Sequence, residues 1–218
     1  MPLMVSDEKS RGLSFRRNTA QELLKKLLQD ASQCTSSTLM TAANALDLIE
    51  NLCAPEVRAD LATNPPIRML VVDDDLMCRR AIAVALQMAF KKPETAENGG
   101  AAVNLAMERP YDVIFMDVQM PGMNGFTACR KIHETVLNRM TPVVFVTCCS
   151  EFEARSQSTA SGGAELIGKP FLTAEITVKA LTYALLGRIQ KRGTSPTILE
   201  RSGSELPHPE DGRARDVA

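Results

Sequence analysis

The stretch VIFMDVQMPGMNGF, at residues 113–126, holds the pattern on which the fold prediction depends. Four apolar residues are followed at once by the acidic residue Asp117 and then by a loop that contains proline and glycine. A continuous apolar run of this kind is typical of a strand that is covered on both faces, as in a parallel sheet. We therefore predict a buried strand here whose carboxyl end presents Asp117.

Similar runs recur on both sides of this stretch and alternate with helical patterns. The strands that we predict lie at residues 68–72, 94–96, 112–116, 143–147 and 164–168. The helices that we predict lie near residues 76–90, 99–108, 125–138, 151–161 and 173–187. Strands that alternate with helices in this way indicate a doubly wound α/β domain. In such a domain, ligands bind beyond the carboxyl ends of the strands.

Polar side chains stand at the ends of four of the predicted strands. They are Asp73, Asp74 and Asp75 after the first strand, Asp117 after the third, Thr147 at the end of the fourth and Lys169 after the fifth. Because parallel strands end at one edge of the sheet, we expect these groups to converge there. Clustered carboxylates need a cation, and oxygen ligands alone favour Mg²⁺. A carboxylate left partly free could then attack phosphorus and form an aspartyl phosphate.

These motifs resemble the receiver domain of two-component response regulators and hybrid histidine kinases. The stretches that carry the resemblance are VVDDD (71–75), VIFMDVQMPGMNGF (113–126), PVVFVT (142–147) and GKPF (168–171). The resemblance covers residues 67–187. It implies a flavodoxin-like, five-stranded parallel sheet in the order 2-1-3-4-5, and we expect a helical extension on its N-terminal side.

The resemblance also implies a role for each matching residue. Asp117 would accept a phosphoryl group from the phosphohistidine of a partner kinase. Asp74 would bind Mg²⁺ directly together with Asp117, Asp73 would support the metal through water, and the backbone carbonyl of Gln119 would be a further ligand. The protein would then be a phosphoacceptor with self-catalysed phosphotransfer and autodephosphorylation, and otherwise not an enzyme.

Further residues would respond to the phosphoryl group. Thr147 would turn its hydroxyl toward it, Lys169 would pair with its charge, and Pro170, in a Lys-Pro bond that is often cis in the family, would aim Lys169 inward. Leu166 stands at a switch position where the family often has an aromatic residue, and leucine can fill that space without offering a hydroxyl. We expect Cys148 and Cys149 to pack as small apolar groups.

Two polar residues have simpler interpretations. Asp75 is expected to be the N-cap of the following helix, and His133 is expected at the surface of a helix. A different class of protein, a Mg²⁺-dependent phosphohydrolase with an aspartate nucleophile, would use Asp73 as the nucleophile and Asp75 as the acid. That alternative leaves Asp117 without a role.

The composition excludes several other classes. The 218 residues carry 25 Lys and Arg against 26 Asp and Glu, and a net charge of −1 argues against a nucleic-acid partner. None of the six cysteines forms a C-x-x-C motif and only two histidines are present, so we do not expect a zinc site. There is no apolar run of about 18 residues and no signal-peptide pattern. We therefore expect a cytoplasmic protein without a membrane span.

Two segments flank the predicted receiver. Residues 1–66 contain a candidate capping box, Thr19-x-x-Glu22, followed by leucines, and a second predicted helix from 38 to 53. These helices could pack together, on the main domain or in a homodimer. Residues 188–218 are polar and are predicted to be a disordered tail, too short for a DNA-binding output domain.

The predicted partners are therefore proteins. They are a sensor histidine kinase or a histidine phosphotransfer protein, and a downstream protein that the sequence does not identify. Two alternatives stay open within this class. The chain could be a receiver-like scaffold, or a fragment of a hybrid histidine kinase that acts as a phosphate sink.

Overall fold

The computed structural model describes residue 25 and residues 35–52, 65–148 and 158–191. Within these residues, five strands form one sheet in the order β2-β1-β3-β4-β5, and all neighbouring strands are parallel. The strands are β1 (Met69–Val72), β2 (Glu94–Ala96), β3 (Val113–Met116), β4 (Val143–Thr147) and β5 (Glu165–Gly168). The predicted order is confirmed, and β1, β3 and β5 each begin one residue later than expected.

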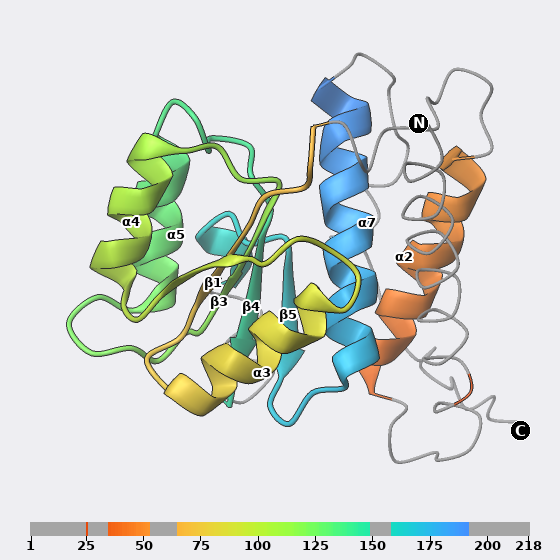
Figure 1. Ribbon diagram of the computed structural model, residues 1–218, viewed down its shortest axis with the longest axis horizontal. Coiled ribbons are helices and arrows are strands. Elements are labelled where there is room, and N and C mark those ends of the chain that lie inside the picture. Colours follow the sequence, from red (N-terminus) through yellow and green to blue (C-terminus); the bar gives the residue numbers. More distant parts are fainter. Residues whose placement is uncertain (1–24, 26–34, 53–64, 149–157, 192–218) are drawn as a thin grey trace, which may run out of the picture.

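Helices cover both faces of this sheet (Figure 1). They are α3 (Leu76–Gln87), α4 (Gly99–Glu108), α5 (Gly125–Glu134) and α7 (Thr173–Lys191), with α2 (Ser36–Leu52) outside them. Val71 and Phe115 pack in the cluster with α3 and α7, whereas their neighbours Leu70 and Ile114 pack in the cluster with α4 and α5. Because both faces are covered, every residue of β1, β3 and β4 is buried. The doubly wound fold class is therefore confirmed.

Capping side chains begin three of these helices near the carboxyl edge of the sheet. Asp75 accepts hydrogen bonds from the N–H groups of Met77 and Cys78, at 2.6 and 3.0 Å. Asn98 and Asn124 cap α4 and α5 in the same way. Each cap satisfies backbone donors that the first helical turn leaves without a partner. The predicted N-cap role of Asp75 is confirmed.

The last helix, α7, continues to Lys191 rather than ending near residue 187. Arg188 accounts for the extra turn. Its Nε and Nη2 atoms lie 2.9 and 2.8 Å from the carboxylate of Asp112, and its Nη1 donates to the carbonyl of Pro65 at 2.6 Å. A bidentate ion pair of this kind is strong where water is largely excluded. Residues 192–218 of the predicted tail lie outside the described residues.

The second predicted N-terminal helix is confirmed as α2, which packs along α7 on the side away from the sheet (Figure 1). Of the three arrangements considered, this helix adopts packing on the main domain. The segment around Thr19 and Glu22, and residues 151–157 of the predicted helix at 151–161, lie outside the described residues. None of the described helices combines the length and the apolar character that crossing a bilayer requires.

Two expectations about side chains are wrong. His133 is half-buried, because its Nε2 atom lies 2.9 Å from the backbone oxygen of Thr141 in the loop before β4. Cys148 is exposed rather than packed, because it directly follows β4 at the edge of the sheet, and Cys149 lies outside the described residues. Both positions depend on where a loop or an edge lies, which local sequence patterns do not reveal.

Candidate functional site

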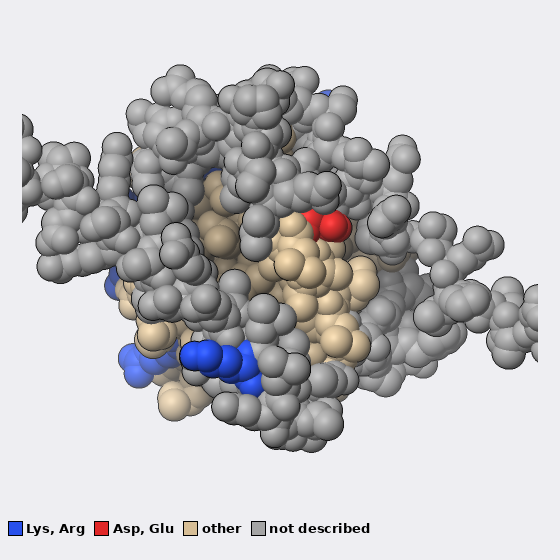
Figure 2. Space-filling view, turned by 90° about the vertical axis from the view of Figure 1, so that its right-hand side faces the viewer, with Lys and Arg blue, Asp and Glu red and all other residues tan. Residues whose placement is uncertain are grey.

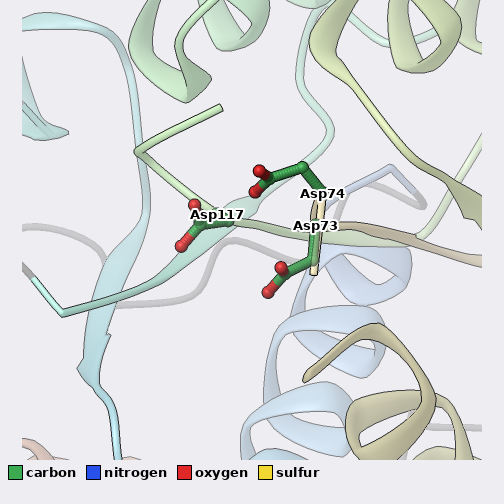
Figure 3. A group of neighbouring side chains, drawn as sticks. All are labelled: Asp73, Asp74 and Asp117. Carbon is green, nitrogen blue, oxygen red and sulfur yellow. The ribbon is translucent and has the colours of Figure 1, made fainter. Parts of the chain in front are cut away.

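Three aspartates gather at the carboxyl edge of the sheet (Figure 3). Asp73 and Asp74 follow β1, Asp117 follows β3, and one oxygen of each lies within 4.8 Å of the others. They meet because β1 and β3 are paired in register, with Val72 opposite Met116. Asp73 and Asp117 are only 1 % and 5 % exposed, whereas Asp74 is exposed. The cluster therefore opens to solvent on the side of Asp74.

Lys169 reaches this cluster from the end of β5. Its Nζ atom lies 2.8 Å from Oδ2 of Asp73 and 3.0 Å from Oδ1 of Asp117. The peptide bond between Lys169 and Pro170 is cis, as expected. Burial lowers the pKa of Lys169, but the hydrogen bonds to Asp73 and Asp117 outweigh burial and raise this pKa above its usual value. The ammonium group therefore stays charged in the site.

Opposing effects act on the carboxyl group of Asp117. Burial raises its pKa, while the hydrogen bond and the charge of Lys169 oppose that rise. The neighbouring carboxylate of Asp73 raises the pKa further, and the N–H of Gln119 lowers it. Three carboxyl groups thus face a single ammonium group. A hard cation fits this set of oxygen donors, because it would balance the negative charge of the carboxylates that Lys169 alone does not neutralise.

Arg79, in the first turn of α3, holds the backbone of the acidic turn. Its Nη1 atom donates to the carbonyl of Asp73 and lies 3.3 Å from the carbonyl of Asp74. The backbone N–H of Asp75 donates to Oδ1 of Asp73 at 2.9 Å. Sequence reasoning missed this role of Arg79. A basic residue one turn into the helix after clustered acids is the signal that could have revealed it.

Thr147 and Lys169 are held side by side by the sheet. Thr147 is the last residue of β4, is buried, and pairs with Gly168 in register. The N–H of Lys169 donates to the carbonyl of Thr147 at 2.8 Å. Leu166, on the same strand as Gly168, is buried in the apolar cluster that also contains Phe145. The hydroxyl and ammonium side chains therefore start from adjacent points on the backbone.

The loop after Asp117 depends on a glycine at the start of α5. A Cβ atom at Gly125 would lie 2.2 Å from the carbonyl oxygen of Asp117, which is closer than such atoms can approach. The N–H of Gly125 donates to the carbonyl of Val118 at 2.9 Å. Gln119 is exposed within this loop. The absence of a side chain at Gly125 thus lets α5 begin directly against the backbone of Asp117.

Comparison with known proteins gives the family. A family model for the response regulator receiver domain matches residues 69–181, and the chain belongs to this family. The transcriptional regulatory protein ResD of Bacillus subtilis is 36 % identical over 116 residues, which cover 52 % of this chain and 47 % of ResD. The signal transduction histidine-protein kinase BarA of Escherichia coli is 26 % identical over 185 residues, 83 % of this chain and 20 % of BarA. The chain thus spans about half of ResD and a fifth of BarA.

Solved structures show the same fold. The chemotaxis protein CheY4 of Vibrio cholerae is 30 % identical with a TM-score of 0.50, over 54 % of this chain and 98 % of CheY4. The receiver domain of the sensor histidine kinase PA1611 from Pseudomonas aeruginosa, which holds a magnesium ion in its active-site cleft, is 24 % identical with a TM-score of 0.51, over 54 % of this chain and 97 % of that domain. Receiver domains are phosphoacceptors that bind Mg²⁺ at an acidic pocket and interact with histidine kinases or phosphotransfer proteins. This chain has such an acidic cluster.

Proposed function

We propose that Asp117 accepts a phosphoryl group from the phosphohistidine of a sensor histidine kinase or a histidine phosphotransfer protein. The phosphorylated chain then changes its contacts with other proteins in a two-component phosphorelay. The observation that carries this proposal is the bridge that Lys169 forms between Asp73 and Asp117, beside Asp74, in a member of the receiver family. A cytoplasmic location stays a prediction from the sequence.

The transfer that we propose exchanges one bond to phosphorus for another. An oxygen of Asp117 forms a bond to phosphorus while the phosphorus–nitrogen bond of the phosphohistidine breaks. The electron pair of the broken bond returns to the imidazole nitrogen, and Asp117 becomes an acyl phosphate. Water later cleaves this acyl phosphate to restore the carboxylate and release phosphate, so that the chain returns to its starting state.

Mg²⁺ is proposed to bind at Asp73, Asp74, Asp117 and the backbone carbonyl of Gln119. These groups offer oxygen ligands only, and the exposed side at Asp74 gives access from solvent. A bound divalent cation would screen the negative charge of the carboxylates and of the phosphoryl oxygens. Arg79 would keep the backbone of Asp73 and Asp74 in place.

Thr147 and Lys169 are proposed to bind the phosphoryl oxygens once Asp117 is modified. The ammonium of Lys169 already lies 3.0 Å from Asp117, and Thr147 starts from the adjacent strand end. The new negative charge favours the conformer in which both side chains turn toward it, which is a shift between two states. Pro170 would direct Lys169 inward, and Leu166 would fill the space that Thr147 leaves.

The contacts of Asp75 count against a phosphohydrolase with Asp73 as the nucleophile. Asp75 would be its general acid, but its carboxylate caps α3, and the backbone N–H groups of Cys78 and Met77 lower its pKa. A general acid needs a raised pKa so that it holds a proton at neutral pH. The environment of Asp75 is therefore the opposite of what that reaction requires.

A relation to hybrid histidine kinases has its own support. The alignment with BarA covers 185 residues, which is longer than the receiver match at 69–181. The similarity therefore extends into the residues that flank the receiver. We keep as a second candidate that this chain corresponds to a receiver-containing part of such a kinase, where it would act as a phosphate sink.

Acetyl phosphate with Mg²⁺ tests the assignment of the acceptor. The wild type and Asp75→Asn, which keeps an N-cap, should each gain the mass of one phosphoryl group, whereas Asp117→Asn should gain none. Equal labelling of Asp117→Asn and the wild type would overturn the assignment. Turnover of small phosphate esters that is lost only in Asp73→Asn would instead identify a phosphohydrolase.

A further inference from the structure

The helix α2 covers the surface that β5 and α7 form, here called the β5–α7 surface. Ser37, Thr41 and Leu48, at spacings of four and seven residues, are buried on its inner face. Leu39 and Leu46, on its outer face, are more than half exposed. Figure 2 views the molecule from the side of α2, and the described atoms there are mainly uncharged. The helix thus docks through hydroxyl groups together with Leu48 and Ala45, and it leaves Leu39 and Leu46 outside.

The covered surface is charged, which is unusual for permanently buried protein. Glu175 and Lys179 of α7 are only 3 % and 1 % exposed beneath α2. Lys179 Nζ lies 3.1 Å from Oε2 of Glu165, and the hydroxyl of Tyr183 donates to the same oxygen at 3.0 Å. Buried ion pairs contribute little net stability, because desolvation opposes their attraction. Such a surface would stay well hydrated if α2 left it, and this favours reversible docking.

The docked end of α2 touches the strand that bears Lys169. The hydroxyl of Ser37 lies 3.2 Å from the carbonyl of Leu166 and 2.5 Å from Oε1 of Glu175. A cavity of about 210 Å³ separates the first turn of α2 from the end of β5, and Thr38, Lys169 and Pro170 are among its lining residues. On its other side, Lys169 binds Asp117. The strand β5, which carries Leu166 and leads directly into Lys169, therefore connects α2 to the candidate phosphorylation site.

We propose that α2 is a built-in ligand of the β5–α7 surface and that phosphorylation of Asp117 releases it. This inference rests on the proposed phosphorylation of Asp117. When the phosphoryl group draws Lys169 and Thr147 toward it, β5 shifts and the contact of Ser37 with Leu166 and Glu175 is lost. Coupling between two sites is reciprocal. Weakening the docking of α2 must therefore favour the state in which Asp117 carries a phosphoryl group or a phosphoryl analogue.

A matched pair of substitutions in the full chain separates docking from general effects on α2. Ala45→Glu places a charge where Ala45 packs against Ala174 and Val178. Ala43→Glu makes the same change at an exposed position of the same helix. Because Ala45→Glu could disturb folding, Ser37→Ala removes the hydroxyl contacts in a milder way.

The probe is beryllofluoride with Mg²⁺, followed by fluorine NMR of the bound ion and by amide hydrogen exchange of residues 36–52. Binding of beryllofluoride should speed amide hydrogen exchange in α2 of the wild type by about tenfold or more, because a helix without its docking surface is marginally stable. Ala45→Glu should exchange fast before loading and should need about fivefold less beryllofluoride for half-saturation. Ser37→Ala should shift both quantities in the same direction, and Ala43→Glu should match the wild type.

Two different failures are distinguishable. A bound fluorine signal without any change of exchange in α2, or equal half-saturation for Ser37→Ala, Ala45→Glu and the wild type, would overturn the release of α2 and leave the proposed function intact. The absence of a bound fluorine signal in the wild type would overturn the proposed function, and the inference would fall with it.

Discussion

The ammonium group of Lys169 lies 3.0 Å from the carboxylate of Asp117, although 52 residues separate them in the chain. The same ammonium contacts Asp73, which lies 96 residues before it. These contacts tie the ends of β1, β3 and β5 together at one point of the sheet edge. One cation thus links the candidate acceptor, the acidic turn and the strand next to α2.

Removal of the ammonium group of Lys169 should destabilise the fold most when no metal ion is bound. Lys169→Met keeps an apolar stem but leaves Asp73 and Asp117 without their ammonium partner. We expect the free energy of unfolding in metal-free buffer to fall by roughly 3 kcal/mol, because a buried charge then lacks its partner. Mg²⁺ should recover part of that loss, as urea unfolding with and without the metal would measure. Lys169→Met should still accept a phosphoryl group, while amide hydrogen exchange in α2 should no longer respond to beryllofluoride.

The control for this variant is Lys131→Met, at an exposed position near the end of α5. Its free energy of unfolding should change by less than about 0.5 kcal/mol. An unfolding free energy of Lys169→Met that equals the wild-type value in metal-free buffer would show that the bridge to the two aspartates contributes nothing to the fold.

Alanine at Gly125 should disturb the acceptor. The new Cβ atom would lie 2.2 Å from the carbonyl oxygen of Asp117, so the backbone there must shift. We expect stability to fall by about 2 kcal/mol and phosphate acceptance from acetyl phosphate to slow by about tenfold or more. Thermal unfolding and the time course of phosphate incorporation, followed by mass, would measure the two effects.

Gly100→Ala is the matched control, since Gly100 is also in a first helical turn. Outside its own helix backbone and chain neighbours, the nearest atom to a Cβ there is Oδ1 of Asn98, at 3.4 Å. This variant should be as stable as the wild type or more stable by roughly 0.5 kcal/mol, with unchanged phosphate acceptance. Equal rates for the two variants would contradict the account of Gly125.

The carboxyl group of Glu175 should make stability depend on pH. Burial beneath α2 raises the pKa of Glu175, although the hydrogen bond from Ser37 and the charge of Lys179 oppose the rise. A folded-state pKa above the unfolded value means that this group stabilises the fold below the unfolded pKa. That contribution is lost as pH rises through the folded-state pKa. Glu175→Gln should therefore gain stability relative to the wild type as the pH is raised from 4 to 7.

The measurement is the difference in urea unfolding free energy between Glu175→Gln and the wild type at several pH values. Glu108→Gln, at the exposed end of α4, controls for the loss of one negative charge. A difference that stays flat with pH, or that moves in favour of the wild type toward neutral pH, would show that burial does not dominate at Glu175.

Much of the fold and of the site could be predicted because local patterns are sufficient for them. Apolar runs without alternation indicate strands buried on both faces, and β1, β3 and β4 are buried throughout. Parallel strands end at one edge, so residues that directly follow paired strands such as β1 and β3 lie close together. Asp73 and Asp117 meet for this reason, and Asp75 caps α3 as its position before a helix indicates.

Other features depend on contacts between distant segments, and local patterns do not encode these. The half-buried ring of His133 reflects the path of the loop before β4. The length of α7 reflects the ion pair of Arg188 with Asp112, which lies 76 residues earlier in the chain, directly before β3. Neither relation has a periodic signal in the sequence.

The sequence by itself determined the buried strands and the acidic edge, because each follows from residue type and spacing along single strands. The strand order and the identity of the candidate acceptor came from the resemblance of its motifs to the receiver family. Only the tertiary structure decided that α2 lies on α7 and that Glu175 and Lys179 are buried beneath it. Charged residues on a helix normally indicate a solvated face. They are buried here because a second helix, far away in the chain, supplies a hydroxyl and a backbone carbonyl as partners.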